Sequence, residues 1–221
     1  DHCFSYHDRI AELNLYDGKA DRYFSGSPVP LAEELRTWAL GETEAISSVT
    51  YPRERPYYVE LSPEKTLPYE LETIEIDTCY NKIFTPEMVA GHWKMASQSL
   101  NSVILSQSMA IKIFGNAESA IGKHMTLMRR LNTSPESTPK TGGIVYIIQA
   151  VMKDIPLNNS LDFMQNIDML TVNDSEGLLQ SPKRHNMTGA NTYVLLSPQT
   201  TCTDLEKQFS KRGYTYTLYG E

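Results

Sequence analysis

The spacing of apolar residues predicts a chain in which short helices alternate with strands. Leu31, Leu35 and Trp38 fall on one face of a predicted helix that begins near Pro30 and stops at Gly41. Two acidic residues in its first turn suit the N-terminal end of the helix dipole. We therefore expect an amphipathic helix early in the chain.

Period-two alternation predicts strands in the next part of the sequence. Residues 49–61 and 69–84 alternate partially, while residues 10–24 are mixed and could hold a strand or the end of a helix. Proline cannot donate a backbone hydrogen bond, so we expect the two alternating runs to form short or edge strands. These prolines are Pro52, Pro56, Pro63 and Pro68.

The most informative local pattern lies between residues 102 and 115. A short apolar run, 103–105, predicts a buried strand, Ser106 is suited to cap a helix, and Gly115 is suited to end it. The predicted helix has one apolar face, formed by Met109, Ala110, Ile113 and Phe114.

The second half of the chain predicts a hairpin and a final strand and helix. Residues 124–131 and 144–155 are strand-like, and the polar segment 132–143 between them predicts an exposed hairpin loop. Residues 191–198 predict another strand. An amphipathic helix follows at 200–213, with Leu205 and Phe209 four residues apart on its apolar face.

Length and charge narrow the function classes. With 221 residues, the chain can form one large domain or two small ones without metal or disulfide support. Its net charge of -7 argues against a nucleic-acid partner, because such binding depends on clustered Lys and Arg. No apolar run reaches the length of a membrane span, and the chain begins at Asp1. We expect a piece excised from a longer protein whose membrane spans lie outside it.

The candidate metal ligands and cysteines do not form a convincing site. The three cysteines contain no CxxC pair, so a zinc cluster is not indicated, although one disulfide and one free thiol are allowed. A metal site at the chain start is conceivable, but a solvated terminus explains the same residues. The residues in question are Cys3, Cys79, Cys202, His2, His7 and Asp8.

Catalytic motifs are also absent from the sequence. Six residues separate Gly115 from Gly122 and His124 replaces the hydroxyl residue, so the AIGKH segment is not a phosphate loop. Lys153 and Asp154 could be an active pair, but the end of a strand that enters a turn at Pro156 explains them more simply. Trp38, Trp93 and the 13 tyrosines could line a ligand cleft, although aromatic residues at these spacings are more often core. We expect no catalytic, cofactor-binding or metal-binding residue, and no cofactor.

Four segments in order resemble one family. They are IFTPEMVAGH (83–92), SVILSQSMAIKIFG (102–115), AIGKHMTL (120–127) and IIQAVMKDIPLNNSLDF (147–163). Together they resemble the periplasmic core domain of MacB/FtsX-type ABC transporter permeases, particularly the long versions of Bacteroidetes-like bacteria. The flanks agree more loosely, in ADRYF before PLAEEL and in residues 192–209. The chain departs from the family pattern in its long 132–143 loop, which puts partner contacts there in doubt.

The resemblance implies an α+β fold with two lobes. A porter-like α/β subdomain would be built from residues 1–84 and 171–221, and an inserted β-rich subdomain from residues 85–170. It also implies a domain on the periplasmic side of the cell inner membrane that transmits motion and carries no chemistry itself. Implied partners are a cytoplasmic ATPase subunit or domain, reached through membrane helices, a periplasmic adaptor or lipoprotein, and a second permease copy. The implied role of the domain is to couple ATP hydrolysis to substrate export or to lipoprotein handling.

Two other classes of protein compete with this interpretation. A secreted ligand-binding module would use an exposed aromatic surface, and a secreted hydrolase would need a cleft that collects several titratable groups. A permease domain instead predicts that the two ends of the chain emerge side by side, because both must enter the same membrane.

Overall fold

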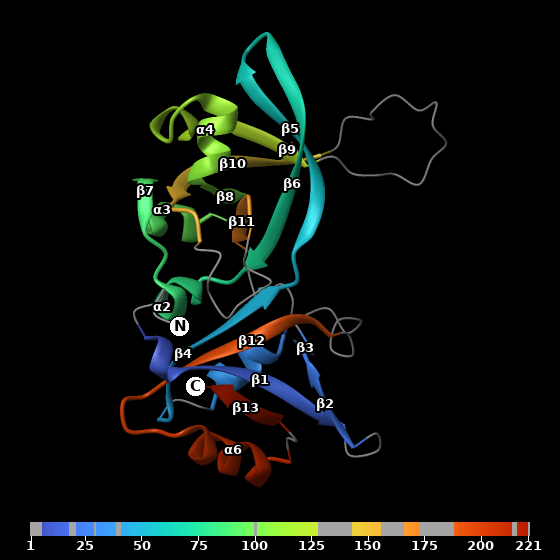
Figure 1. Cartoon of the computed structure of the whole chain (residues 1–221), viewed down its shortest axis with the longest axis vertical. Coiled ribbons are helices and arrows are strands. Elements are labelled where there is room, and N and C mark those ends of the chain that lie inside the picture. The colour runs from blue at the N-terminus through green and yellow to red at the C-terminus, as the bar shows by residue number, and fades with distance from the viewer. Residues whose placement is uncertain are drawn as a thin grey trace, which may run out of the picture.

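The computed structural model consists of two lobes stacked along its long axis (Figure 1). It combines helices with a large sheet, which confirms the predicted α+β class. The described residues are 6–17, 21–28, 30–38, 41–99, 101–127, 143–155, 166–172, 188–213 and 216–220. The predicted hairpin loop at 132–143 falls almost entirely outside these residues, as do His2 and Cys3.

The terminal lobe, in the lower half of Figure 1, contains strands from both ends of the chain. Strand β12 (Thr188–Leu196) lies between β4 (Thr43–Thr50) and β1 (Ile10–Asp17), and β13 (Tyr216–Gly220) pairs with the other edge of β1. Two short strands extend this sheet, β2 (Arg22–Ser25) beside β1 and β3 (Ser27–Pro28) beside β12. A short 3-10 helix, η1 (His7–Arg9), precedes β1.

Helices α1 (Leu31–Arg36) and α6 (Cys202–Lys211) supply apolar side chains to the core of the terminal lobe. Thr201 and Asp204 form a capping box at the start of α6, and the predicted pair Leu205 and Phe209 is fully buried. Helix α1 is shorter than the predicted 30–40. The lobe core consists of Ala11, Leu13, Leu31, Ala32, Leu35, Ile46, Val194, Leu196, Leu205 and Phe209.

The ring lobe, in the upper half of Figure 1, contains six strands that pair in a closed circuit. The circuit runs through β5 (Arg53–Ser62), β6 (Lys65–Ile76), β11 (Met169–Val172), β8 (Ser102–Ser106), β10 (Ile144–Met152) and β9 (His124–Leu127), which pairs with β5 again. Every strand contributes to one apolar cluster, which includes Tyr57, Val59, Leu71, Val103, Leu105, Met125, Ile148 and Met169.

Four short elements complete the ring lobe. Strand β7 (Met88–Gly91) pairs with β10, and α2 (Tyr80–Phe84) and α3 (Trp93–Ser97) lie on either side of it in sequence. The 3-10 helix η2 (Glu118–Ala120) leads into β9. Gly91 has a positive φ, and a Cβ there would lie 2.2 Å from the Gln149 carbonyl oxygen, so this close approach requires glycine.

The predicted helix after Ser106 is confirmed as α4 (Gln107–Phe114). The Ser106 hydroxyl accepts a hydrogen bond from the Met109 backbone N–H at 3.3 Å, and Gly115 ends the helix in the left-handed conformation. The apolar face packs into the ring-lobe cluster, with Met109 and Ile113 buried and Phe114 partly buried. Local capping and one apolar stripe therefore sufficed to locate this element.

Two expectations for residues 49–84 were wrong. The alternating run 69–84 does not stay extended, because Tyr80–Phe84 forms α2. Strands β5 and β6 are neither short nor confined to an edge, although they contain Pro56 and Pro68. Each proline lies where its strand is paired on one side only, which is the kind of position at which a strand tolerates proline.

The predicted boundaries of the two subdomains, 1–84 plus 171–221 and 85–170, stay a prediction. In the structure β5 and β6 pair with β9 and β11, so these strands lie in the ring lobe together with residues from the middle of the chain. The link between the lobes therefore falls near residues 50–52 and 76–79.

Replacing Ser106 with alanine should lower the free energy of unfolding by about 1 kcal/mol, because the N–H at the start of α4 loses its side-chain acceptor. Chemical denaturation of the 221-residue chain would measure the change. Ser119→Ala, at an exposed position in η2, is the control and should differ little from the unaltered protein. Equal stability of the two variants would contradict the assigned cap.

Candidate functional site

The joint between the lobes is the most constrained polar region of the described structure. Within the described residues, β4 and β6 share a single register pair, Val49 with Ile76. One further bond reinforces it, because the Glu75 backbone N–H donates to the Thr50 hydroxyl at 2.8 Å. So little strand pairing means that side chains must hold the lobes together.

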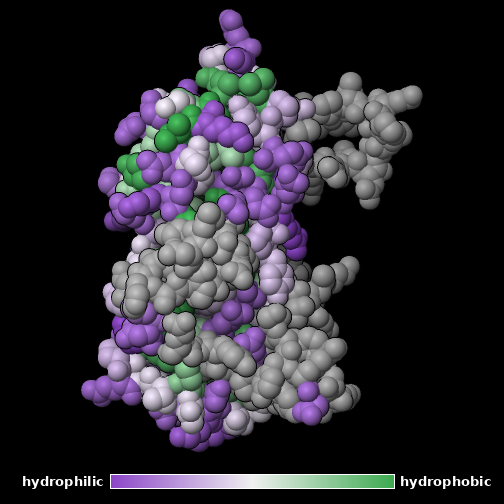
Figure 2. All heavy atoms as spheres, viewed as in Figure 1, coloured by the Kyte–Doolittle hydropathy of each residue, from purple (hydrophilic) through white to green (hydrophobic). Residues whose placement is uncertain are grey.

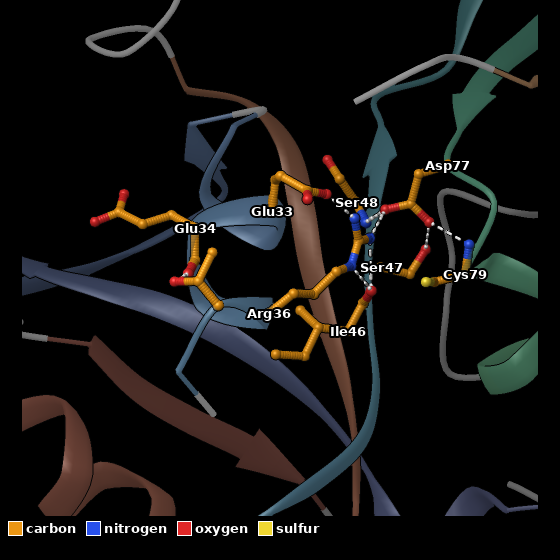
Figure 3. A network of polar contacts seen from close by, with 9 residues as sticks. Glu33, Glu34, Arg36, Ile46, Ser47, Ser48, Asp77 and Cys79 are labelled. Carbon is orange, nitrogen blue, oxygen red and sulfur yellow. Dashed lines mark hydrogen bonds and ion pairs between the residues drawn. The ribbon is translucent and has the colours of Figure 1, made fainter. Parts of the chain in front are cut away.

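Asp77 provides the main polar contact across the joint (Figure 3). It follows directly after β6, and it is only 3% exposed. Its Oδ1 accepts hydrogen bonds from the Ser47 hydroxyl at 2.8 Å and the Cys79 N–H at 2.9 Å, and its Oδ2 accepts one from the Ser48 N–H at 2.9 Å. One carboxylate thus ties β4 of the terminal lobe to the start of α2.

Arg36 approaches the same carboxylate from α1. Its guanidinium donates to Asp77 Oδ2, to the Ile46 carbonyl oxygen and to Glu33 Oε2, the last at 2.6 Å (Figure 3). Burial is the largest single influence and acts to lower the pKa of Arg36, but the charge of Asp77 and the hydrogen bonds to Asp77 and Glu33 together outweigh it, so the pKa is raised. The Arg36 guanidinium therefore stays charged at every physiological pH. We call Arg36, Asp77 and the groups bound to them the joint clasp.

An apolar cluster spans the joint beside the clasp. Tyr193 and Leu195 of β12 and Val49 of β4 pack with α2, α3 and the lower strands of the ring lobe. The Phe84 ring meets Tyr193 edge-on with centroids 5.1 Å apart, and it meets Tyr80 at 4.8 Å. Tyr80 stacks on Trp93 at 6.1 Å. These four rings form a continuous aromatic path from β12 to α3.

The clasp was not foreseen from the sequence. Asp77 ends an alternating run, and the i, i+3, i+4 spacing of Tyr80, Ile83 and Phe84 is helical, so a break at Asp77 could have been recognised. Nothing local indicates that Arg36, 41 residues earlier, is its partner. Burial also raises the pKa of the Cys79 thiol beside the clasp, which disfavours its reactive thiolate form.

Lys153 and Asp154 have structural partners. Lys153 Nζ lies 3.1 Å from Glu87 Oε2, and Asp154 Oδ1 accepts a hydrogen bond from the Ser108 N–H at 3.0 Å. Asp154 thereby caps the start of α4 together with Ser106. The AIGKH segment is a turn, with Gly122 at φ +78° directly before β9.

The aromatic and metal candidates form no open site in the described part of the chain. Trp38 packs edge-on against Phe209 at 5.5 Å under the Arg212 guanidinium, and Trp93 belongs to the aromatic path. Among the described residues no group of three or more His, Cys, Asp or Glu could hold a metal ion. Cys79 and Cys202 are free thiols.

One cavity, of about 270 Å³, lies beside the start of α4. It is lined by Ser108, Asp154, Ile155, Asn166, Ile167 and Asp168. Burial raises the pKa of Asp168, but its Oδ2 already accepts the Glu72 N–H at 2.9 Å. The carboxylates that line the cavity are thus engaged in holding the fold.

The two-lobed fold is similar to that of solved domains of permease and MacB proteins. The chain is similar to a domain of a protein described as a permease from Porphyromonas gingivalis, with a TM-score of 0.72 and 21% identity over 99% of this chain and 93% of that one. It is also similar to the periplasmic region of MacB from Actinobacillus actinomycetemcomitans, with a TM-score of 0.61 and 14% identity over 97% and 90%.

No protein-family model and no curated protein sequence matches the chain. The similarity to solved structures therefore concerns the fold. No helix among the described residues is long and apolar enough to cross a membrane.

Removing the clasp carboxylate should destabilise the protein strongly. Asp77→Ala should lower the free energy of unfolding by about 3 kcal/mol, because it removes the buried carboxylate partner of the Arg36 guanidinium and the acceptor of two backbone N–H groups. Glu44→Gln, which removes the charge of a more exposed ion pair with Arg9, should change it by less than about 1 kcal/mol. If thermal or chemical unfolding gave similar losses of stability for the two variants, the clasp would contribute no more than an exposed ion pair.

Proposed function

We propose that this chain is the extracytoplasmic domain of an ABC transporter permease, located on the periplasmic side of the inner membrane. In this proposal it performs no catalysis. It couples ATP hydrolysis by a cytoplasmic partner to substrate export or to the handling of a lipoprotein outside the membrane.

The arrangement of the first and last strands carries the proposal. Strands β1 and β13 are antiparallel neighbours, and Ala11 pairs with Gly220. The chain therefore enters and leaves the terminal lobe at adjacent points, as a domain inserted between two membrane helices requires. The similarity of the fold to the periplasmic region of MacB supports the same location.

The joint supports a role in transmitting motion. A displacement of the terminal lobe can reach the ring lobe only if the lobes do not slide past each other. The clasp and the aromatic path provide such resistance, because buried side chains pack densely and change arrangement in discrete steps. A hydrolase would instead require an activated nucleophile or a metal near a cleft, and the two carboxylates of the described cavity already accept backbone hydrogen bonds, Asp154 from Ser108 and Asp168 from Glu72.

The ring lobe also presents apolar side chains to solvent, several of which gather on the face seen in Figure 2. Those with the largest exposure are Met95, Ile111, Val145 and Ile144. Exposed apolar groups are a common feature of protein contact surfaces. They are consistent with the proposed partners, which are a periplasmic adaptor, a lipoprotein or a second permease copy.

Labelling of the full-length gene product tests the location. In a full-length variant in which every cysteine, including Cys3, Cys79 and Cys202, is replaced by serine, a single cysteine at exposed Ser119 should react with a membrane-impermeant maleimide in cells with a permeabilised outer membrane and an intact inner membrane. A cytoplasmic domain would react only after lysis. The cysteine-free variant is the control for background labelling.

A distance measurement tests the transmission of motion. Spin labels at exposed Ser119 in the ring lobe and Ser210 on α6 should give one narrow distance distribution. Phe84→Ala should broaden it, because the aromatic path loses its central ring. Phe114→Ala, which removes a ring packed against the ring-lobe cluster and not part of the joint cluster, is the matched control and should leave the width unchanged. A broad distribution in the unaltered protein would contradict a stiff joint.

A further inference from the structure

A half-buried carboxylate lies at the inner end of the aromatic path. The Tyr193 hydroxyl donates a hydrogen bond to Glu12 Oε2 at 3.2 Å, and it accepts one from Asn191 Nδ2 at 3.2 Å. The same Tyr193 ring contacts Phe84 of the ring lobe. Glu12, Tyr193 and Asn191 therefore form a polar chain that ends on the contact between the lobes.

Strand register places this chain on the joint side of the terminal lobe. Glu12 and Tyr193 are directly opposite each other on β1 and β12, so their side chains share a face. Ile10 points the same way and packs against the joint cluster, whereas Ala11 and Leu13 point into the terminal-lobe core. Asn191 is a diagonal neighbour of Glu12 on that face, within reach of a long side chain.

The polar chain of Glu12, Tyr193 and Asn191 lacks one hydrogen-bond donor. Asn191 is 5% exposed, and its Oδ1 has no partner among the described residues. A tyrosine hydroxyl bound to an ionised carboxylate approaches to about 2.5–2.7 Å, so the 3.2 Å contact to Glu12 is long for such a pair. A protonated carboxyl group carries one O–H donor that the carboxylate does not have.

The groups that face Glu12 give its negative charge little support. Among the described side chains, Tyr193 on β12 and Tyr51 after β4 are its titratable neighbours, and Tyr80 on α2 lies beyond Tyr193. Tyr219 of β13 is also opposite Glu12 in the strand register. Arg9, on the preceding turn, is engaged with Glu44 and with the Leu196 carbonyl oxygen, each at 2.8 Å. Burial raises the pKa of Glu12, and the hydrogen bond from Tyr193 only partly offsets the rise.

We propose that Glu12 is a proton-binding site that controls the stiffness of the joint: its carboxyl group is protonated when the lobes are tightly packed, and its ionisation loosens the contact between Tyr193 and Phe84. The linkage has a definite direction. Because the folded pKa is raised, Glu12 contributes stability below its ordinary pKa, and that contribution is lost as the pH rises through the folded pKa.

The proposal concerns the folded chain alone and does not rest on the permease function. Failure of the experiment below would leave the proposed transporter role untouched, and failure of the labelling experiment would leave the proton site untouched.

The proposed proton site is tested by hydrogen exchange of the α2 backbone. Exchange is followed between pH 4 and pH 8 and corrected for the intrinsic exchange rate at each pH. In the unaltered protein, protection of the 80–84 amides should fall with rising pH, by up to about tenfold per pH unit between the unfolded and folded pKa values of Glu12. Glu12→Gln, a neutral isostere with its own N–H donors, should remove this decrease. Glu118→Gln, at an exposed carboxylate of η2, should retain it.

A second variant keeps the test decisive if Glu12→Gln folds poorly. Tyr193→Phe removes the hydroxyl that favours the carboxylate form, so the loss of protection should move to higher pH. Protection that falls identically in the unaltered protein and in Glu12→Gln, or a midpoint unmoved by Tyr193→Phe, would overturn the proposal.

Discussion

The structure depends on one buried carboxylate at the point where the chain passes between the lobes. Asp77 is nearly inaccessible to water, and a charge in that position is tolerated only because every approach to it is occupied by a donor. The donors come from α1, β4 and the start of α2. The hydrogen bonds to this one carboxylate thus fix the relative positions of two helices and one strand.

The aromatic path complements the clasp through a different kind of force. Ion pairs and hydrogen bonds are directional, whereas the rings from Tyr193 to Trp93 contribute apolar area and edge or stacked contacts. Together they make the joint resist both sliding and separation. The ring lobe adds its own rigidity, because its six strands pair in a closed circuit.

The polar chain of Glu12, Tyr193 and Asn191 lies next to the clasp and the aromatic path, and we propose that its protonation state alters how tightly the lobes pack. It lies on β1, the strand that pairs with the last strand of the chain, and it ends on the ring that contacts α2. Glu12 therefore lies on the strand by which the chain enters the terminal lobe, and through Tyr193 it contacts the region where the lobes meet.

The sequence by itself determined the features that depend on neighbouring residues. Helix α4 was predicted from Ser106, Gly115 and one apolar stripe, and α6 from the spacing of Leu205 and Phe209, because capping and amphipathic periodicity act over a few residues. The family resemblance rests on four short sequence segments in order, and the α+β class was implied by that resemblance. Only the tertiary structure decided that Pro56 and Pro68 lie within long strands and that Arg36 binds Asp77. Those outcomes depend on which distant strand or side chain each residue meets, and the pairing of groups 41 or 181 positions apart leaves no trace in local periodicity.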